Sequence, residues 1–241
     1  MKSPRHTVAG VALATLCVTS FTACSGDDKS PANSGADGKA SPEEVMAFAK
    51  TKLDETSGVK LSLSTQDERA SGDFLKHAEG TITDAPAFDG TAGGRFLNFD
   101  QDSVGVISVD GKFYVDVPVL GWQTFKPADL CAPDPALLLD PDTGVSNVLT
   151  ASVGLEEGEP TRSESDNSVV VTPYSGTVPG EAVANILPCA PGDEFDVTFD
   201  ITADGFLRSA AMTGEFFSGA TDVTYTFDIS DYDVEQEITA P

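Results

Sequence analysis

The chain has 241 residues, with 39 acidic and 14 basic side chains, and its formal net charge at pH 7 is −25. Such acidity argues against nucleic-acid binding, since phosphates require a basic protein surface, and against charge-driven adhesion to anionic lipid headgroups. In an exported protein the same acidity favours solubility.

The N-terminal residues have the pattern of an export signal. Lys2 and Arg5 give a positive start, and an apolar run follows at residues 8–18. This run has the length of a secretory signal but is shorter than the roughly 20 apolar residues that span a bilayer. We therefore expect residues 1–23 to be a signal peptide.

The end of this signal resembles a bacterial lipobox. Small residues precede Cys24 in FTACSG, and Phe21 stands where leucine is usual. Cys24 is then the expected lipidation site and the new N-terminus, which places the protein on the extracytoplasmic face of the cell membrane. An ordinary secreted protein cleaved near Ala23 is the alternative.

The rest of the chain divides into a tether and one domain. After Cys24, residues up to 40 are small and polar and are interrupted by Pro and Gly, so residues 24–40 are expected to be a flexible tether. Residues 41–241 have a length that suits one β-rich domain.

The domain begins with a predicted helix. Ser41 can cap it, Pro42 suits its first turn, and Glu44 completes a capping box. Gly58 is its expected end. An apolar stripe at helical spacing follows the cap: Val45, Met46, Phe48, Ala49 and Leu53.

Alternation of apolar and polar residues predicts antiparallel strands with one buried face. Asp110-Gly111 is a strong two-residue hairpin turn between two of them. The predicted strands are residues 59–65, 103–109, 112–119, 194–202, 206–217 and 222–230. The residues expected on the buried face include Phe113, Val115, Val117, Val119, Phe195, Val197, Phe199, Ile201, Val223, Tyr225, Phe227 and Ile229.

Short helical segments are expected between the strand blocks. One begins at Pro127 and one at Pro135, and the latter should stop near Asp140 because the residue before a proline avoids the α region. Asp142 or Thr143 can cap the next helix. The segment 180–187 gives a last one.

These helices have apolar faces that, with Trp122 and Phe125, should seek the buried side of the sheet. The pattern predicts an α+β fold with the helices gathered on one sheet face. Their apolar residues are Leu137, Leu138, Val145, Val148, Leu149, Val183, Ile186 and Leu187.

The two remaining cysteines, Cys131 and Cys189, predict one disulfide in an exported protein, with two buried thiols as the alternative. Metal binding by this pair is not expected, because His77 is the only histidine after the signal.

No motif predicts catalysis or a cofactor. The sequence GVSNV lacks the second glycine of a nucleophile elbow. The DPDTG stretch fails as an EF-hand, because Gly144 and Ala151 stand where ligands are required. An extracellular hydrolase that uses His77 or a pair of acids remains an alternative.

The apolar helices over the sheet leave two interpretations, a solid core or a ligand cavity. Replacing Val148 or Leu149 with Trp should reduce ligand loading if the stretch covers a cavity. The same change should reduce stability if the core is solid.

Four stretches, in order, resemble the LppX/LprA/LprF/LprG family of envelope lipoproteins from mycobacteria and other actinobacteria. The likeness runs from about residue 42 to Pro241. The stretches are ISVDGKFYVDV with GWQTF, LLLDPDTGVSNVLTA, SGTVPGEAVANILP and DISDYDVEQEITAP.

This resemblance implies a curved antiparallel β half-barrel with short helices across its concave face and an apolar cavity between them. It implies a monomer that carries acylated lipids or glycolipids across the cell envelope, without catalysis, and with an unknown transporter or assembly partner. The residues expected to line the cavity are Leu137, Leu138, Val145, Val148, Leu149, Phe113, Val115, Val117, Val183, Ile186, Val197, Phe199, Val223, Tyr225 and Phe227. An anchored interaction module with a filled core is the rival.

Overall fold

The computed structural model describes residues 39–68, 72–96, 99–218 and 222–241. The predicted signal peptide, Cys24 and nearly all of the predicted tether lie outside the described residues. Residues Ala40–Pro241 form one compact unit.

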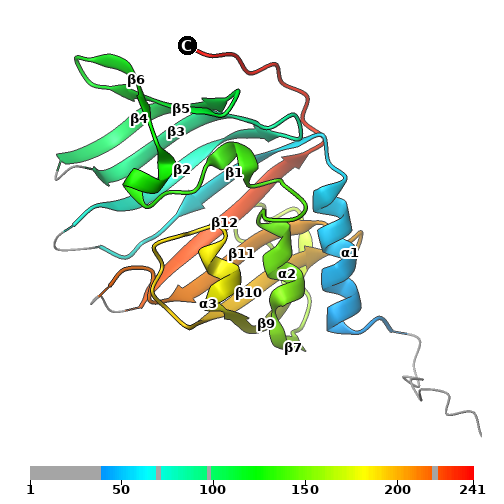
Figure 1. Cartoon of the computed structure of the whole chain (residues 1–241). Coiled ribbons are helices and arrows are strands. Elements are labelled where there is room, and N and C mark those ends of the chain that lie inside the picture. The colour runs from blue at the N-terminus through cyan, green and yellow to red at the C-terminus, as the bar shows by residue number, and fades with distance from the viewer. Residues whose placement is uncertain (1–38, 69–71, 97–98, 219–221) are drawn as a thin grey trace, which may run out of the picture. The chain divides into compact units, whose positions relative to one another are not determined.

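One open, curved antiparallel sheet of twelve strands forms the body of this unit (Figure 1). Along the sheet the order is β6-β5-β4-β3-β2-β1-β12-β11-β10-β9-β7, and β8 pairs with β9. The first six strands form a meander, and β12 returns to pair with β1 at the centre. The strands are β1 Gly58–Ser64, β2 Phe74–Thr83, β3 Ala87–Phe96, β4 Phe99–Val109, β5 Lys112–Val117, β6 Gly121–Phe125, β7 Val153–Glu157, β8 Thr161–Arg162, β9 Val170–Pro179, β10 Glu194–Thr202, β11 Leu207–Gly214 and β12 Val223–Tyr232.

The helices lie together on one side of this sheet (Figure 1). They are α1 Pro42–Asp54, the 3-10 turns η1 Pro127–Leu130 and η2 Pro135–Leu137, α2 Ser146–Ala151 and α3 Gly180–Ala184. The α+β fold with helices on one sheet face is therefore confirmed.

The N-terminal helix α1 starts as predicted but ends earlier. Ser41 and Glu44 form the capping box, with the Glu44 N–H donating to Ser41 Oγ (3.3 Å) and the Ser41 N–H to Glu44 Oε2 (2.8 Å). The helix ends at Asp54, not at Gly58, because Gly58 is already the first residue of β1. There the backbone of Val234 lies so close that a Cβ on Gly58 would be 2.5 Å from its carbonyl oxygen.

The predicted β4–β5 hairpin is present. Asp110 and Gly111 both have positive φ, 54° and 68°, which a two-residue type I′ turn requires. Val109 pairs with Lys112 directly beside the turn. This register places the side chains of Phe113 and Val115 on the helix-facing side of the sheet.

Two predictions about the next strand are wrong. Val119 does not extend the buried face of β5, because the strand ends at Val117 and Val119 lies fully exposed in a turn. Trp122 points away from the helices: it pairs with Asp116, and its ring lies over Gly105 on the opposite sheet face. Phe125 does share the face of Phe113, its cross-strand partner.

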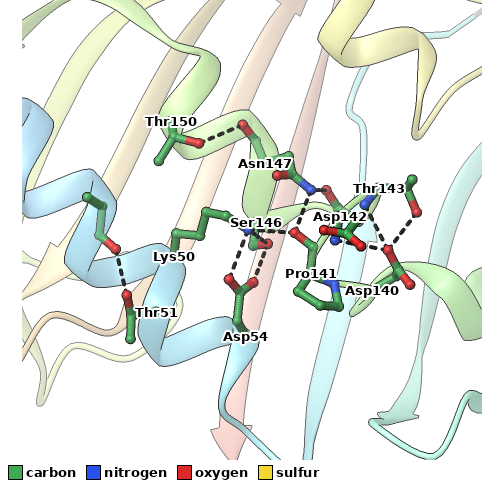
Figure 2. A network of polar contacts seen from close by, with 12 residues as sticks. Lys50, Thr51, Asp54, Asp140, Pro141, Asp142, Thr143, Ser146, Asn147 and Thr150 are labelled. Carbon is green, nitrogen blue, oxygen red and sulfur yellow. Dashed lines mark hydrogen bonds and ion pairs between the residues drawn. The ribbon is translucent and has the colours of Figure 1, made fainter.

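The segment between η2 and α2 is a tight polar turn. The Asp140 carboxylate accepts hydrogen bonds from the Asp142 and Thr143 N–H groups (3.0 and 2.8 Å) and from the Thr143 hydroxyl (2.9 Å), as Figure 2 shows. These bonds, that of the Thr143 hydroxyl first, lower the pKa of Asp140. A Cβ on Gly144 would be 2.4 Å from Leu138 O, so the turn requires glycine.

This turn corrects the predicted capping of α2. The N-cap residue is Val145, and it makes no side-chain capping bond. Asp142 and Thr143 instead donate backbone N–H groups to Asp140, one turn earlier. The reason is that Asp140 already presents its carboxylate to those N–H groups.

A partly buried polar contact joins α1 to α2 (Figure 2). Ser146 Oγ donates to Asp54 Oδ1 (2.5 Å) and accepts from Lys50 Nζ (3.0 Å), and Lys50 forms an ion pair with Asp54 (2.9 Å). Lys50 Nζ also donates to the Pro141 carbonyl (2.7 Å). These bonds fix the start of α2 on α1.

Candidate functional site

A continuous row of apolar side chains crosses the helix-facing side of the sheet. Each residue is the cross-strand partner of the next, so their side chains share one face. We call this the apolar row; it consists of Phe199, Ala210, Phe227, Leu63, Ala78, Ala92 and Val104, from β10, β11, β12, β1, β2, β3 and β4.

The two ends of the apolar row are buried and its middle is not. Phe199 and Val104 are 2% and 8% exposed. The side chains between them are all partly accessible: Ala210, Phe227, Leu63, Ala78 and Ala92. Three of these are alanines, so the side chains in the middle of the row are small as well as apolar.

The region beneath the α-helices is different, because it is filled. We call it the helix-covered core. Apart from Ile82 of β2, its largest and most completely buried side chains are Phe195, Phe199, Met46, Leu53, Leu149, Ile201, Ile229, Val59, Val178 and Val183. Phe195 also packs on Phe216, with ring centroids 4.8 Å apart. The helix-covered core holds the fold together.

The predicted cavity-lining residues fall into both regions. Val148, Leu149 and Val183 lie on helices and are buried in the hydrophobic core. Leu137 is 49% exposed on η2. Phe113, Val197, Phe199, Val223 and Tyr225 are buried on the helix-facing side, and Leu138, Val145, Val115, Val117, Ile186 and Phe227 are partly buried there.

Sequence reasoning missed most of the middle of the apolar row. Only Phe227 was predicted, and Leu63, Ala78, Ala92 and Ala210 were not. Alanine carries a weak burial signal, and β1 and β12, which align Leu63 with Phe227, are distant in sequence. The available signal was alternation, since Ala78 lies between the polar residues His77 and Glu79.

Two pockets of the described residues lie on the outer, polar side. The larger, of about 780 Å³, faces away from the helices. Burial raises the pKa of Asp228 in it, and the carboxylate of Asp200 adds to the increase. Residues with outward side chains in its lining include Lys60, Ser62, Glu79, Thr81, Thr91 and Asp228. Neither pocket lies between sheet and helices, where the cavity was expected.

The predicted disulfide is present. Cys131 and Cys189 are bonded, with Cα atoms 5.4 Å apart. Cys131 follows η1, and Cys189 follows α3, so the bond joins two of the covering segments. The chain between them includes η2, whose Asp134 accepts from the Ala136 N–H and from the buried Ser108 hydroxyl (2.6 Å) of β4.

The described residues give no support for catalysis. The ring of His77 lies against Gly93 on the outer face of β2. Within the described ranges no three His, Cys, Asp or Glu side chains are grouped as metal ligands would be. No described helix has the length and apolar character needed to span a membrane.

Comparison with known proteins gives the family. The family model described as "LppX_LprAFG lipoprotein" matches residues 41–238. The chain belongs to this lipoprotein family. The lipoarabinomannan carrier protein LprG of Mycobacterium tuberculosis (strain ATCC 25618 / H37Rv) is 31% identical over 198 residues, which cover 78% of this chain and 77% of LprG. LprG of Mycobacterium bovis (strain BCG / Pasteur 1173P2) matches equally.

Solved structures of the family share the fold. LprF from Mycobacterium bovis superposes with a TM-score of 0.67 at 14% identity, covering 83% of this chain and 96% of LprF. LppX from Mycobacterium tuberculosis gives 0.58 at 15% identity, covering 81% of this chain and 98% of LppX. The half-barrel fold predicted from the sequence is therefore that of its relatives.

Proposed function

We propose that this protein is a membrane-anchored, non-enzymatic carrier that binds acyl chains of lipids or glycolipids on the apolar row and moves them across the cell envelope. The observation that carries the proposal is the accessible middle of the row. Its side chains are apolar and face the helices, yet they are only partly covered.

The size of this surface suits a hydrocarbon chain. At a strand spacing of about 4.8 Å, the middle of the row, from Ala210 to Ala92, spans about 19 Å. One leaflet of a bilayer core is about 15 Å thick. Each methylene shielded from water contributes about 0.8 kcal/mol, so binding needs apolar contact and no reactive group.

The short segments on the helix side of the sheet, η1, η2, α2 and α3, would allow an acyl chain to enter beside the sheet. The helix-covered core is filled. A bound acyl chain therefore has to lie on the apolar row or displace partly buried side chains on the helix side of the sheet. Partly buried residues of the segments on the helix side that pack against the core include Leu138, Val145, Ile186 and Leu187. Binding is then a rearrangement of short segments that the disulfide and the Ser146 contacts hold at their ends.

The membrane location follows from the expected lipid on Cys24. One acyl chain anchors a protein only marginally, whereas two or more chains hold it stably. The LprG relatives are named as carriers of lipoarabinomannan, which supports a lipid-bearing cargo for this chain as well.

A filled interaction module is the second candidate, and the dense helix-covered core favours it. The two candidates differ in one measurable property, the binding of acyl chains. Full-length protein carrying Cys24→Ala, purified from its own host, is extracted with organic solvent and the extract is analysed by mass spectrometry. A specific acylated lipid supports the carrier; its repeated absence, together with no uptake of a fluorescent fatty acid, contradicts it.

A pair of neighbouring substitutions locates the site. Ala92→Trp fills the middle of the row, whereas Thr91→Trp places the same ring on the opposite face, in the polar pocket. We expect Ala92→Trp to weaken binding of the fluorescent fatty acid about tenfold or more, and Thr91→Trp to leave it unchanged. Equal affinities in both variants would rule out the row.

A further inference from the structure

The turn between β5 and β6 exposes two apolar side chains at the edge of the sheet. The Leu120 N–H donates to the Val117 carbonyl (3.0 Å), which closes a β-turn through Pro118 and Val119. Val119 is 104% exposed and Leu120 is 69% exposed. We call these two residues the β5–β6 tip.

The backbone of the tip is strained. Val119 has φ +72°, in the left-handed region where a β-branched side chain is strongly disfavoured. In a turn with proline at its second position, the third position ordinarily takes glycine. Here the position carries a bulky apolar side chain that makes no buried contact. Val119 therefore strains the backbone, and its side chain is fully exposed to water.

The tip lies in an uncharged stretch of a strongly acidic chain. Residues 117–125 contain no charged side chain, although the chain carries 39 acidic residues. The Gln123 amide donates to the carbonyls of Leu120 (3.2 Å) and Trp122 (2.9 Å), which satisfies polar groups beside the tip. A convex, uncharged, apolar tip matches the interior of a bilayer better than the surface of a charged partner.

The tip also continues the helix-facing apolar surface. Val115 pairs with Val106 on β4, close to the Val104 end of the apolar row, and Val117 follows on the same face of β5. From Val117 the chain passes directly into the tip. A lipid leaving a bilayer at the tip would meet apolar side chains along this strand.

We propose that the β5–β6 tip inserts into the surface of the lipid bilayer and forms the contact through which acyl chains pass between membrane and protein. The proposal rests on the proposed lipid-carrier function. Because the chain is so acidic, the bilayer it fits is one with zwitterionic headgroups, and anionic headgroups oppose the contact.

The native probe for this contact is Trp122, the single tryptophan, two residues beyond Leu120. The chain from residue 24 onward, with Cys24→Ala, is titrated with phosphatidylcholine vesicles and with vesicles that also contain phosphatidylglycerol. Binding is followed by Trp122 fluorescence and by co-sedimentation. The protein is expected to bind the phosphatidylcholine vesicles, with a blue shift of the fluorescence, and to bind the anionic vesicles more weakly.

Substitutions in the tip separate contact from folding. Leu120→Ser should weaken vesicle binding about tenfold. Val119→Gly should also weaken it, while the melting temperature rises by about 2–4 °C because strain is relieved. Val153→Ser, which removes a 54% exposed valine from the far edge strand β7, is the matched control and should bind as the parent does.

If Leu120→Ser and Val119→Gly bind vesicles as tightly as the parent, or if the parent does not bind vesicles, the tip contact is wrong. Saturation of a soluble fluorescent fatty acid is measured in the same variants and is expected to be unchanged. Vesicle binding without any fatty-acid binding would overturn the carrier function and this transfer role, and would leave only a membrane contact.

Discussion

The helix-covered core and the middle of the apolar row lie on the same face of one sheet and are built from the same alternating strands, yet only the first is filled. Phe195 and Phe227 show the contrast. Phe195 on β10 is 1% exposed and packs on Phe216, whereas Phe227 on β12 is only partly buried. The difference lies in what covers the strands.

Three α-helices cover the first region, and one of them, α1, is held to α2 by the Lys50, Asp54 and Ser146 contacts. Over β2, β3 and β4 the cover is the 3-10 turn η2, held by the Asp134–Ser108 hydrogen bond. Ala78 and Ala92 on these strands stay partly accessible, although Ile82 and Phe88 on the same strands are buried. Uneven cover therefore leaves part of one apolar face buried and part of it accessible.

The largest expected effect comes from truncating one phenylalanine in each region. Phe195→Ala should reduce the free energy of unfolding by about 3–5 kcal/mol, because it leaves a cavity in a packed region. Phe227→Ala should reduce it by about 1–2 kcal/mol, because the side chain is already partly exposed, and should weaken fatty-acid binding. Urea denaturation of both variants gives the comparison. Equal losses of stability would mean that the two regions do not differ.

Removal of the disulfide tests whether the bond between the segments after η1 and α3 restrains the cover over the sheet. Replacing Cys131 and Cys189 with serine should lower stability by about 2–4 kcal/mol, since the unfolded chain loses a long covalent loop. It should also speed the exchange of a bound fluorescent fatty acid, because η2 and α3 are no longer tied at their ends. Chemical reduction of the parent is the control. Unchanged melting and unchanged lipid loading would contradict the role of the bond as a clamp on the cover.

The smallest expected effect is a change in stability from a substitution on the outer, polar face of the sheet. Burial raises the pKa of Asp228 above its ordinary 3.8, so the charged carboxylate is disfavoured in the folded state. Asp228→Asn should therefore stabilise the protein at pH 7 by less than about 1 kcal/mol. The gain should shrink as the pH falls through the raised pKa of Asp228 and vanish near pH 3, below the pKa of the unfolded chain. A gain that is independent of pH would refute this cause.

Local signals predicted much of the fold. The Ser41–Glu44 capping box and the Asp110-Gly111 turn are set by residues a few positions apart, and both are present. The alternation in β10 placed Phe195 and Val197 on the buried face. The cysteine count predicted the disulfide, because export leaves one possible pair after Cys24.

The features that were not predicted depend on how the strands pair, both within one hairpin and between distant segments. Trp122 faces outward because β6 pairs with β5 in a register that puts it opposite Asp116. The apolar row forms only when β1 joins β12, which brings Leu63 beside Phe227. Composition alone does not reveal that alignment, and the low hydrophobicity of Ala78 and Ala92 hides it further.

The most direct test of the central claim is photo-crosslinking with a fatty acid that carries a diazirine near its chain end, followed by peptide mass spectrometry of the full-length Cys24→Ala protein. We predict labels on β1, β3, β11 and β12, at or beside Leu63, Ala92, Ala210 and Phe227, and their loss in Ala92→Trp but not in Thr91→Trp. Labels confined to the polar pocket around Lys60 and Asp228, or no specific label at all, would contradict the account.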